Sequence, residues 1–462
     1  MEIPQQTAQV TGPVSGGTKG WPFAASMLDI AALGYEEAEY LIEGEACRYA
    51  QVPGTDWGRD GRWHAQATET AAYRTRFLVY RPTDPEKFNG TVIVTWNNVT
   101  AGYELFGADS AEIFEGGYAL VCATVQKVGI EGLPPLHQGL AQWDSQRYGE
   151  LAISGDDYSY DIYTQIGRAV GPARDSKGAD PMAGMTVERV IAQGASQSAG
   201  RLGTYYNAIA PLTSVFDGYV LSIYFGRGTA LEVGEAVVNI NDSTAYSSPA
   251  DQLAGTNLLR DDLAVPAFIV NSELEAIACH GVRQPDSDTL RWWETAGTCH
   301  VSQQSRAARE DMAQRDQLVT RPGEESINAV PIAPLYDAAY FHMHHWLKDG
   351  LKPPIAPRIN FSGKPPVVER DDDGIATGGI RWPQVEAPIA TNSAIPLSED
   401  IFAYLGGSSQ PFAQSRLQTL YDNKSAFLKQ FESAAAEAVA AGFLRPREVA
   451  RLVQEAADRW PD

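Results

Sequence analysis

The chain has 462 residues, of which 44% are hydrophobic and 20% are charged. This composition is typical of a globular protein and excludes a largely disordered or fibrous one. Its 36 Lys and Arg residues against 58 Asp and Glu residues give a net charge of −22. That charge argues against binding to nucleic acids and anionic membrane surfaces, because both are bound through clustered Lys and Arg. The length allows between one and about three domains.

The sequence has no apolar run of the roughly eighteen residues that cross a bilayer. Its first residues lack a basic region followed by an apolar run, which predicts a cytoplasmic protein, with a trimmed secreted form as the alternative. The four cysteines are too sparse for a disulfide scaffold and include no C-x-x-C pair. Cys122 lies in an apolar run and is expected to be buried, whereas Cys279 and Cys299 could be bridged or free.

In chain order, residues 1–35 are rich in Gly and Pro and predict an N-terminal arm. Residues 36–80 alternate polar and apolar positions, which predicts antiparallel strands at a sheet edge. Short apolar runs predict further strands at 91–96, 118–125, 188–192, 215–225 and 265–271. Helical spacing predicts helices at 157–170, 198–210, 334–348 and 433–444. Buried strands that alternate with helices indicate an α/β fold with a mostly parallel central sheet.

The remaining segments predict the domain organisation. Residues 226–262 are polar and turn-rich, and residues 303–330 are polar with helical propensity, so both are expected to be cap-like insertions. Residues 355–397 are Pro-rich and extended, and the last 65 residues are expected to be helical. We therefore predict a catalytic domain at 36–355 and a C-terminal extension at 356–462 that packs on it.

The strongest chemical signal is the sequence GASQSAG at 194–200, which directly follows a predicted strand and precedes a predicted helix. This context is typical of the nucleophile elbow of alpha/beta-hydrolases, a sharp turn with small residues two positions before and after the nucleophile. Gly194 and Ser198 meet this requirement around Ser196, although a serine replaces the usual final glycine. Ser198 is the alternative nucleophile, and a strand-to-helix turn without chemistry is the alternative to both.

A serine nucleophile needs a base that is oriented by an acid, and in alpha/beta-hydrolases the acid and then the histidine follow the serine along the chain. Glu275 is the predicted acid because it occupies the usual place after a strand. Glu273 is the close alternative and Asp286 a distant one. His300 is the predicted base, since His280 follows the acid too soon.

The oxyanion hole requires two backbone N–H groups that point to the developing negative charge. The residue after the nucleophile, Gln197, is predicted to supply one of them. The loop after the strand at 91–96 is predicted to supply the other, from Asn98 or Val99. An ordinary turn without this role is the alternative for that loop.

Neither a metal nor a cofactor is predicted. His342 and His345 share a helix face, but no Glu-x-x-His pattern accompanies them, so packing or surface positions are favoured over metal ligands. The sequence DDDG at 371–374 lacks the alternating ligands and the final Glu of a calcium loop.

At these residues the sequence resembles the bacterial alpha/beta-hydrolase domain family whose elbow reads GxSQSxGR. The resemblance covers most of the chain, on segments such as YALVCATVQKVGI, DDYSYDIYTQIGRAV, GASQSAGRLGTYYNAIAPL, RQPDSDTLRWWETAGTCH and HHWLKDGLKPP. It implies the alpha/beta-hydrolase fold and a serine esterase with Ser196 as nucleophile and His300 as base. The family's Glu-x-Asp pair after the acid strand is Glu273-x-Glu275 here, which leaves the acid open.

Together these residues predict a serine hydrolase that cleaves a carboxylic ester or lactone through an acyl-enzyme. An acyltransferase or lyase with the same triad, or a binding protein on a hydrolase fold, is the alternative. The negative charge disfavours anionic polymers, so a small neutral ester is the expected substrate. The natural substrate and the oligomeric state stay open.

Overall fold

The computed structural model describes residues 8–105, 110–174, 178–229, 231, 256–320, 327–398 and 401–461. The chain divides into two compact units, Met1–Ala267 with Arg309–Arg321 and Phe268–Ala308 with Pro322–Asp462. Most of the predicted insertion at 226–262, and residues 321–326 of the one at 303–330, lie outside the described residues. The predicted division into a catalytic domain and a C-terminal extension stays a prediction.

The described part of the first unit contains a sheet with the strand order β1-β2-β3-β5-β4-β6-β7. Its strands are β1 (Gln9–Thr11), β2 (Tyr35–Gln51), β3 (Ala65–Pro82), β4 (Thr91–Trp96), β5 (Ala119–Ala123), β6 (Arg189–Ala195) and β7 (Gly218–Ser222). Strands β1, β2, β3 and β5 pair antiparallel in that order, whereas β5, β4, β6 and β7 pair parallel. The predicted α/β class with an antiparallel N-terminal part is confirmed.

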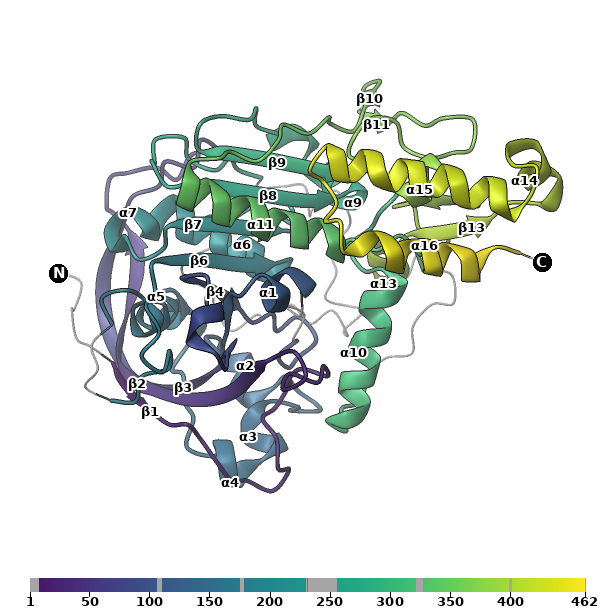
Figure 1. Cartoon of the computed structure of the whole chain (residues 1–462). Helices are drawn as coiled ribbons and strands as arrows, with labels where there is room; N and C mark the ends of the chain where they lie inside the picture. Colours follow the sequence, from purple (N-terminus) through teal and green to yellow (C-terminus); the bar gives the residue numbers. More distant parts are fainter. Residues whose placement is uncertain are drawn as a thin grey trace. The chain divides into compact units, whose positions relative to one another are not determined.

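The pattern of each strand explains its place in this sheet. β2 and β3 form a long curved hairpin, drawn in purple, and their alternating polar and apolar residues suit an edge with one face toward solvent (Figure 1). β5 and β7 are buried at every residue, as continuous apolar runs require. Helix α5 (Ser159–Val170) packs against β2 and β4, and α6 (Gln197–Thr204) packs against β6 and β7.

Several helices of the first unit differ from the prediction. The helix expected at 157–170 begins as a 3-10 turn, Asp156–Tyr158, before α5. The helix expected at 198–210 is α6 followed by a π-helical turn, Tyr205–Ile209. Short helices that the sequence did not indicate are α1 (Ala111–Glu115), α2 (Lys127–Glu131), α3 (Leu140–Trp143), α4 (Ser145–Tyr148) and α7 (Ala210–Thr213).

In the second unit, strand β8 (Ala267–Ser272) neighbours β9 (Leu290–Thr295), and the short helix α9 (Glu273–Ala278) follows β8 directly. Two small antiparallel sheets pair β10 (Phe361–Ser362) with β11 (Val367–Val368) and β12 (Ala390–Ser393) with β13 (Ser408–Pro411). The sequence did not indicate β9 or α9.

The remaining helices are α10 (Gln303–Arg315), α11 (Ala333–Asp349), α12 (Pro383–Glu386), α13 (Ile401–Gly406), α14 (Gln414–Leu420), α15 (Lys424–Ala440) and α16 (Glu448–Arg459). The helix predicted at 433–444 is the second half of α15, which begins nine residues earlier because Asn423 caps it by accepting the N–H of Ala426. Among the described residues, no helix combines the length and the hydropathy that a membrane span needs.

Candidate active site

Ser196 lies at the turn between β6 and α6, in the first unit. Its backbone angles are φ 61° and ψ −120°, a region that residues with a side chain rarely adopt. The N–H of Ser196 donates to the carbonyl of Ser222 on β7 at 3.0 Å, and its carbonyl accepts the N–H of Gly200 at 3.1 Å. A strained serine between a parallel strand and a helix is the geometry of a nucleophile elbow.

The position two residues before Ser196 has no room for a side chain, and Gly194 occupies it. A Cβ atom at Gly194 would lie 2.8 Å from the backbone carbonyl group of Ser198, closer than real contacts allow. The turn therefore brings the end of β6 against the first turn of α6, and a side chain at this position would force the two apart.

Ser196 and Ser198 differ in their surroundings. Ser196 is half-buried at the elbow, whereas Ser198 lies inside α6 and its exposed fraction is 0%. The Oγ atom of Ser198 has no hydrogen-bond partner among the described residues. A buried helical hydroxyl is poorly placed to attack a substrate, which favours Ser196 over its alternative.

The loop after β4 is tied to the elbow through Asn98. The side-chain Nδ2 of Asn98 donates to the carbonyl of Ala195 at 3.0 Å, and its Oδ1 accepts the N–H of Thr100 at 2.8 Å. The carbonyl of Asn98 accepts the N–H of Leu105 at 2.7 Å. The sequence indicated only a backbone role for Asn98, and this contact shows that its side chain also fixes the loop against the peptide that precedes Ser196.

A buried polar network holds α6, the helix that follows Ser196. The guanidinium of Arg201 lies 3.2 Å from the Oδ2 atom of Asp156, which also accepts the side-chain N–H of Gln126 at 2.8 Å. The Oε1 atom of Gln126 in turn accepts the indole N–H of Trp96, the last residue of β4, at 3.0 Å. The network thus joins the end of β4 to the middle of α6. Sequence reasoning missed it, although the elbow pattern itself ends in Arg201.

The predicted acid and base meet in the second unit. The Oε1 atom of Glu275 lies 2.7 Å from Nδ1 of His300, and the exposed fractions of the two residues are 0% and 7%. Glu275 is also the third residue of α9, where its Oε2 accepts hydrogen bonds from the N–H and the hydroxyl of Ser272 in a capping box. A carboxylate on Nδ1 holds the imidazole in the tautomer whose Nε2 can accept a proton.

The alternative acids have other partners. The Oε2 atom of Glu273 accepts the N–H of Gly297 at 2.8 Å, and its Oε1 lies 2.5 Å from the guanidinium of Arg370. Asp286 accepts the N–H of Trp292 at 3.0 Å and pairs with the guanidinium of Arg358 at 3.0 Å. The geometry inside this unit therefore brings His300 together with Glu275.

The four cysteines are buried free thiols, so the bridge that the sequence left open between Cys279 and Cys299 is absent. Burial raises the pKa of both thiols well above the usual value, and the carboxylate of Glu275 raises both further. The Sγ atom of Cys299 contacts the carbonyl oxygen of Gly406 at 2.8 Å. A thiol with a raised pKa is a poor nucleophile, so Cys279 and Cys299 are poor candidates for that role.

The histidines near the end of α11 have partners of their own. Nε2 of His342 lies 2.7 Å from the carbonyl oxygen of Gly442, and Nδ1 of His345 lies 2.6 Å from Oδ2 of Asp349. In the part of the chain that the structure describes, no group of three His, Cys, Asp or Glu side chains is placed to hold a metal ion.

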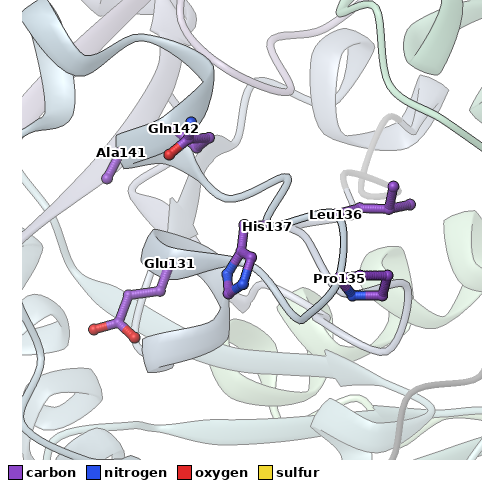
Figure 2. Close-up of a pocket in the computed structure, with 6 residues that line it drawn as sticks. All are labelled: Glu131, Pro135, Leu136, His137, Ala141 and Gln142. Atoms are coloured by element: carbon purple, nitrogen blue, oxygen red, sulfur yellow. The ribbon is translucent and has the colours of Figure 1, made fainter.

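A recess of about 500 Å³ lies in the first unit, around the loop that joins α2 to α3 (Figure 2). It is lined by Glu131, Pro135, Leu136, His137, Ala141 and Gln142. None of Ser196, Glu275 and His300 is among these lining residues.

The family model of the alpha/beta hydrolase domain matches residues 10–454. Among solved structures, the chain is similar to esterase Est22, at 12% identity and a TM-score of 0.30 over 62% of this chain and 80% of that one. It is also similar to brefeldin A esterase, a bacterial homologue of human hormone sensitive lipase, at 13% identity and a TM-score of 0.27 over 60% of this chain and 78% of that one.

The chain has no match among the curated protein sequences. The family match, in contrast, begins at β1 and continues into α16, so it takes in the elbow as well as the histidine and its acid. The chain therefore belongs to the alpha/beta hydrolase domain family.

Proposed function

We propose that this protein is a serine hydrolase that cleaves a carboxylic ester or lactone. The observation that carries the proposal is the strained backbone of Ser196 between a parallel strand and α6. The buried pair of Glu275 and His300 supports it, because a histidine oriented through Nδ1 is the base that a serine nucleophile needs. Family membership supports a hydrolase in general terms.

The proposed reaction has two halves. The Oγ atom of Ser196 attacks the ester carbonyl carbon while Nε2 of His300 takes the hydroxyl proton, and the proton then passes to the leaving alcohol as the C–O bond breaks. Water deprotonated by His300 next attacks the acyl-enzyme, which releases the acid and returns the proton to Ser196. Glu275 keeps the imidazole oriented and stabilises its charged form.

The negative charge on the carbonyl oxygen is proposed to be stabilised by two backbone N–H groups. One is that of Gln197, the first residue of α6, whose N–H points out of the helix without an intrahelical acceptor. The other is that of Asn98 or Val99 in the loop after β4, which the side chain of Asn98 holds against Ala195. Such preorganised donors stabilise the transition state by several kcal/mol, about 3 to 4 for one donor.

Small neutral esters and lactones are the proposed substrate class. The chain carries a net charge of −22, which repels anionic polymers at long range. A panel of p-nitrophenyl esters with graded acyl length, followed by lactones, tests this proposal. Turnover that requires an alcohol acceptor would instead indicate an acyltransferase.

Replacing Ser196 with Ala tests the nucleophile. We expect Ser196→Ala to lower kcat for p-nitrophenyl esters by at least about 10⁴-fold and to abolish covalent labelling by a fluorophosphonate, because both need the Oγ atom. Ser198→Ala is the matched control, since this neighbouring hydroxyl is buried and lies inside α6. Retained turnover in Ser196→Ala, or its loss in Ser198→Ala alone, contradicts the assignment. Wild-type protein that is neither labelled nor active indicates a binding protein on a hydrolase fold.

A further inference from the structure

Glu273 has a buried carboxylate that the proposed triad does not use. It lies at the first position of α9. Its Oε1 atom accepts hydrogen bonds from the guanidinium of Arg370 at 2.5 Å and from the N–H of Ala394 at 3.3 Å. Its Oε2 atom accepts the N–H of Gly297 at 2.8 Å. A buried carboxylate stays charged only when it is paired and hydrogen-bonded, and here the cation is Arg370. A buried ion pair adds little net stability over apolar groups of the same volume, and its best-attested role is to specify one conformation.

The ion pair of Glu273 and Arg370 contacts the loop that leads from β9 to His300, and the conformation of this loop is what it can specify. Gly297 has a φ of +68°, and a Cβ atom there would lie 2.7 Å from the side chain of Val385. Its N–H is held by Glu273 and its carbonyl accepts the side-chain N–H of Asn328 at 2.9 Å. Both backbone polar groups of Gly297, three residues before His300, are therefore hydrogen-bonded.

Helix α9 therefore contacts this loop at two points. Glu273 binds its backbone at Gly297, and Glu275 binds the imidazole ring of His300. Residues two positions apart on a helix point in directions about 200° apart, so the two carboxylates serve different parts of the same loop. Proton transfer needs the base within hydrogen-bond reach of the reacting hydroxyl, and an error of about 1 Å can lower the rate about 100-fold.

Arg370 brings the C-terminal part of the chain into this arrangement. It lies 97 residues after Glu273, and its Nη1 atom also donates to the carbonyl of Gly374 at 3.1 Å, which fixes the guanidinium. Without Arg370 the buried carboxylate of Glu273 would lose its cation while keeping only backbone donors.

We infer that Glu273, held by Arg370, is a positioning residue for His300, distinct from the acid Glu275. The inference rests on the serine-hydrolase function proposed above, but its structural part concerns only contacts within the second unit. It also gives a role to the two carboxylates of the Glu273-x-Glu275 pair that the sequence left interchangeable.

The test uses Glu273→Gln and Arg370→Gln in the full chain, with Glu369→Gln as the matched control. Glu369 is exposed and adjacent to Arg370, so its loss changes the net charge by the same amount as Glu273→Gln. Two properties are measured. The first is the turnover of p-nitrophenyl acetate, as KM and as kcat, with kcat calculated per serine that a fluorophosphonate labels. The second is the imidazole N–H proton resonance of His300 in a Ser196→Ala background, which requires no turnover.

For both test variants we expect kcat to fall about 10- to 100-fold with KM within about two-fold of wild type, and the His300 resonance to shift or disappear. The control variant Glu369→Gln is expected to keep the wild-type kcat, KM and His300 resonance. A purely structural role lowers the melting temperature but leaves kcat per labelled serine and the resonance unchanged, and that result overturns the inference.

Two further outcomes are also decisive. If Glu273→Gln does not fold, Arg370→Gln carries the test, because its guanidinium side chain is 19% exposed and its loss is easier to accommodate. If the wild type shows neither turnover nor labelling, the proposed function fails, and the His300 resonance alone decides whether Glu273 positions the imidazole.

Discussion

At the scale of single residues, the proposed site contains two carboxylates that are chemically the same and differ only in direction. Glu275 turns toward the imidazole of His300, and Glu273 turns toward a backbone N–H and a guanidinium. The sequence placed both after a strand but did not indicate α9, and without the helix their directions cannot be assigned. Once the helix is known, its geometry separates positions two apart.

The role of Glu275 leads to a prediction. Glu275→Gln keeps the shape of the side chain and can still bond to Ser272, but a neutral amide stabilises the imidazolium poorly and can present an N–H to Nδ1. We expect kcat to fall by about 10⁴-fold, the loss seen when a triad acid becomes an amide. Asp286→Asn is the control, since Asp286 pairs with Arg358. Wild-type kcat in Glu275→Gln would remove Glu275 from the proposed triad.

At the scale of secondary structure, neighbouring elements hold the strained turn at Ser196, the proposed elbow. β6 and α6 set the strained turn, the loop after β4 is bound to it through Asn98, and the pair of Arg201 and Asp156 anchors α6 from behind. Strain at a functional residue persists only where the surrounding structure holds it in place. The contacts of Asn98, Arg201 and Asp156 are the ones that hold the strained backbone of Ser196 in place.

The Arg201–Asp156 pair can be tested by a double-mutant cycle. Arg201→Met leaves the carboxylate of Asp156 buried without its cation, and we expect the free energy of unfolding to fall by about 3 kcal/mol. Adding Asp156→Asn removes that charge, so the double variant should be more stable than the sum of the single effects by at least about 1 kcal/mol. Urea unfolding followed by tryptophan fluorescence measures both quantities. Simple additivity would show that the two side chains are not coupled.

At the scale of the whole molecule, we expect stability to depend on pH through His342, a buried histidine of the second unit that the proposed triad does not use. Burial lowers the pKa of His342 below its usual value; the hydrogen bond to the carbonyl of Gly442 opposes this effect, while Arg445 and His345 add to it. The unfolded chain, in which this histidine has a pKa near 6.5, therefore takes up a proton before the folded chain does. Stability from this group is present at neutral pH and is lost as the pH falls below about 6.5 toward the folded pKa.

His342→Gln removes this titration and retains a side-chain N–H for the carbonyl of Gly442. We expect the urea midpoint of this variant to fall less than that of the wild type between about pH 7 and pH 5.5, since one protonation equilibrium contributes at most about 1.4 kcal/mol for each pH unit. His64→Gln, at an exposed position, is the control. An identical pH dependence in His342→Gln and wild type would show that this histidine does not contribute.

The sequence by itself determined the features that depend on neighbours along the chain. The period of apolar residues predicted the strands and the α/β class, and the small residues around Ser196 predicted the sharp turn after β6, because a Cβ at Gly194 meets the backbone only four residues away. The order of serine, acid and histidine along the chain likewise predicted the triad, which stays a prediction.

Only the tertiary structure decided which distant groups meet. The choice of Glu275 as partner of His300, the contact of Glu273 with Arg370 across 97 residues, and that of Asp156 with Arg201 across 45 residues depend on how the elements pack. Such side chains are often solvated surface groups, and their sequence surroundings carry no signal of burial. A buried charge must find a partner, and which partner it finds is set by the fold, because residues far apart in sequence become neighbours only after the elements have packed.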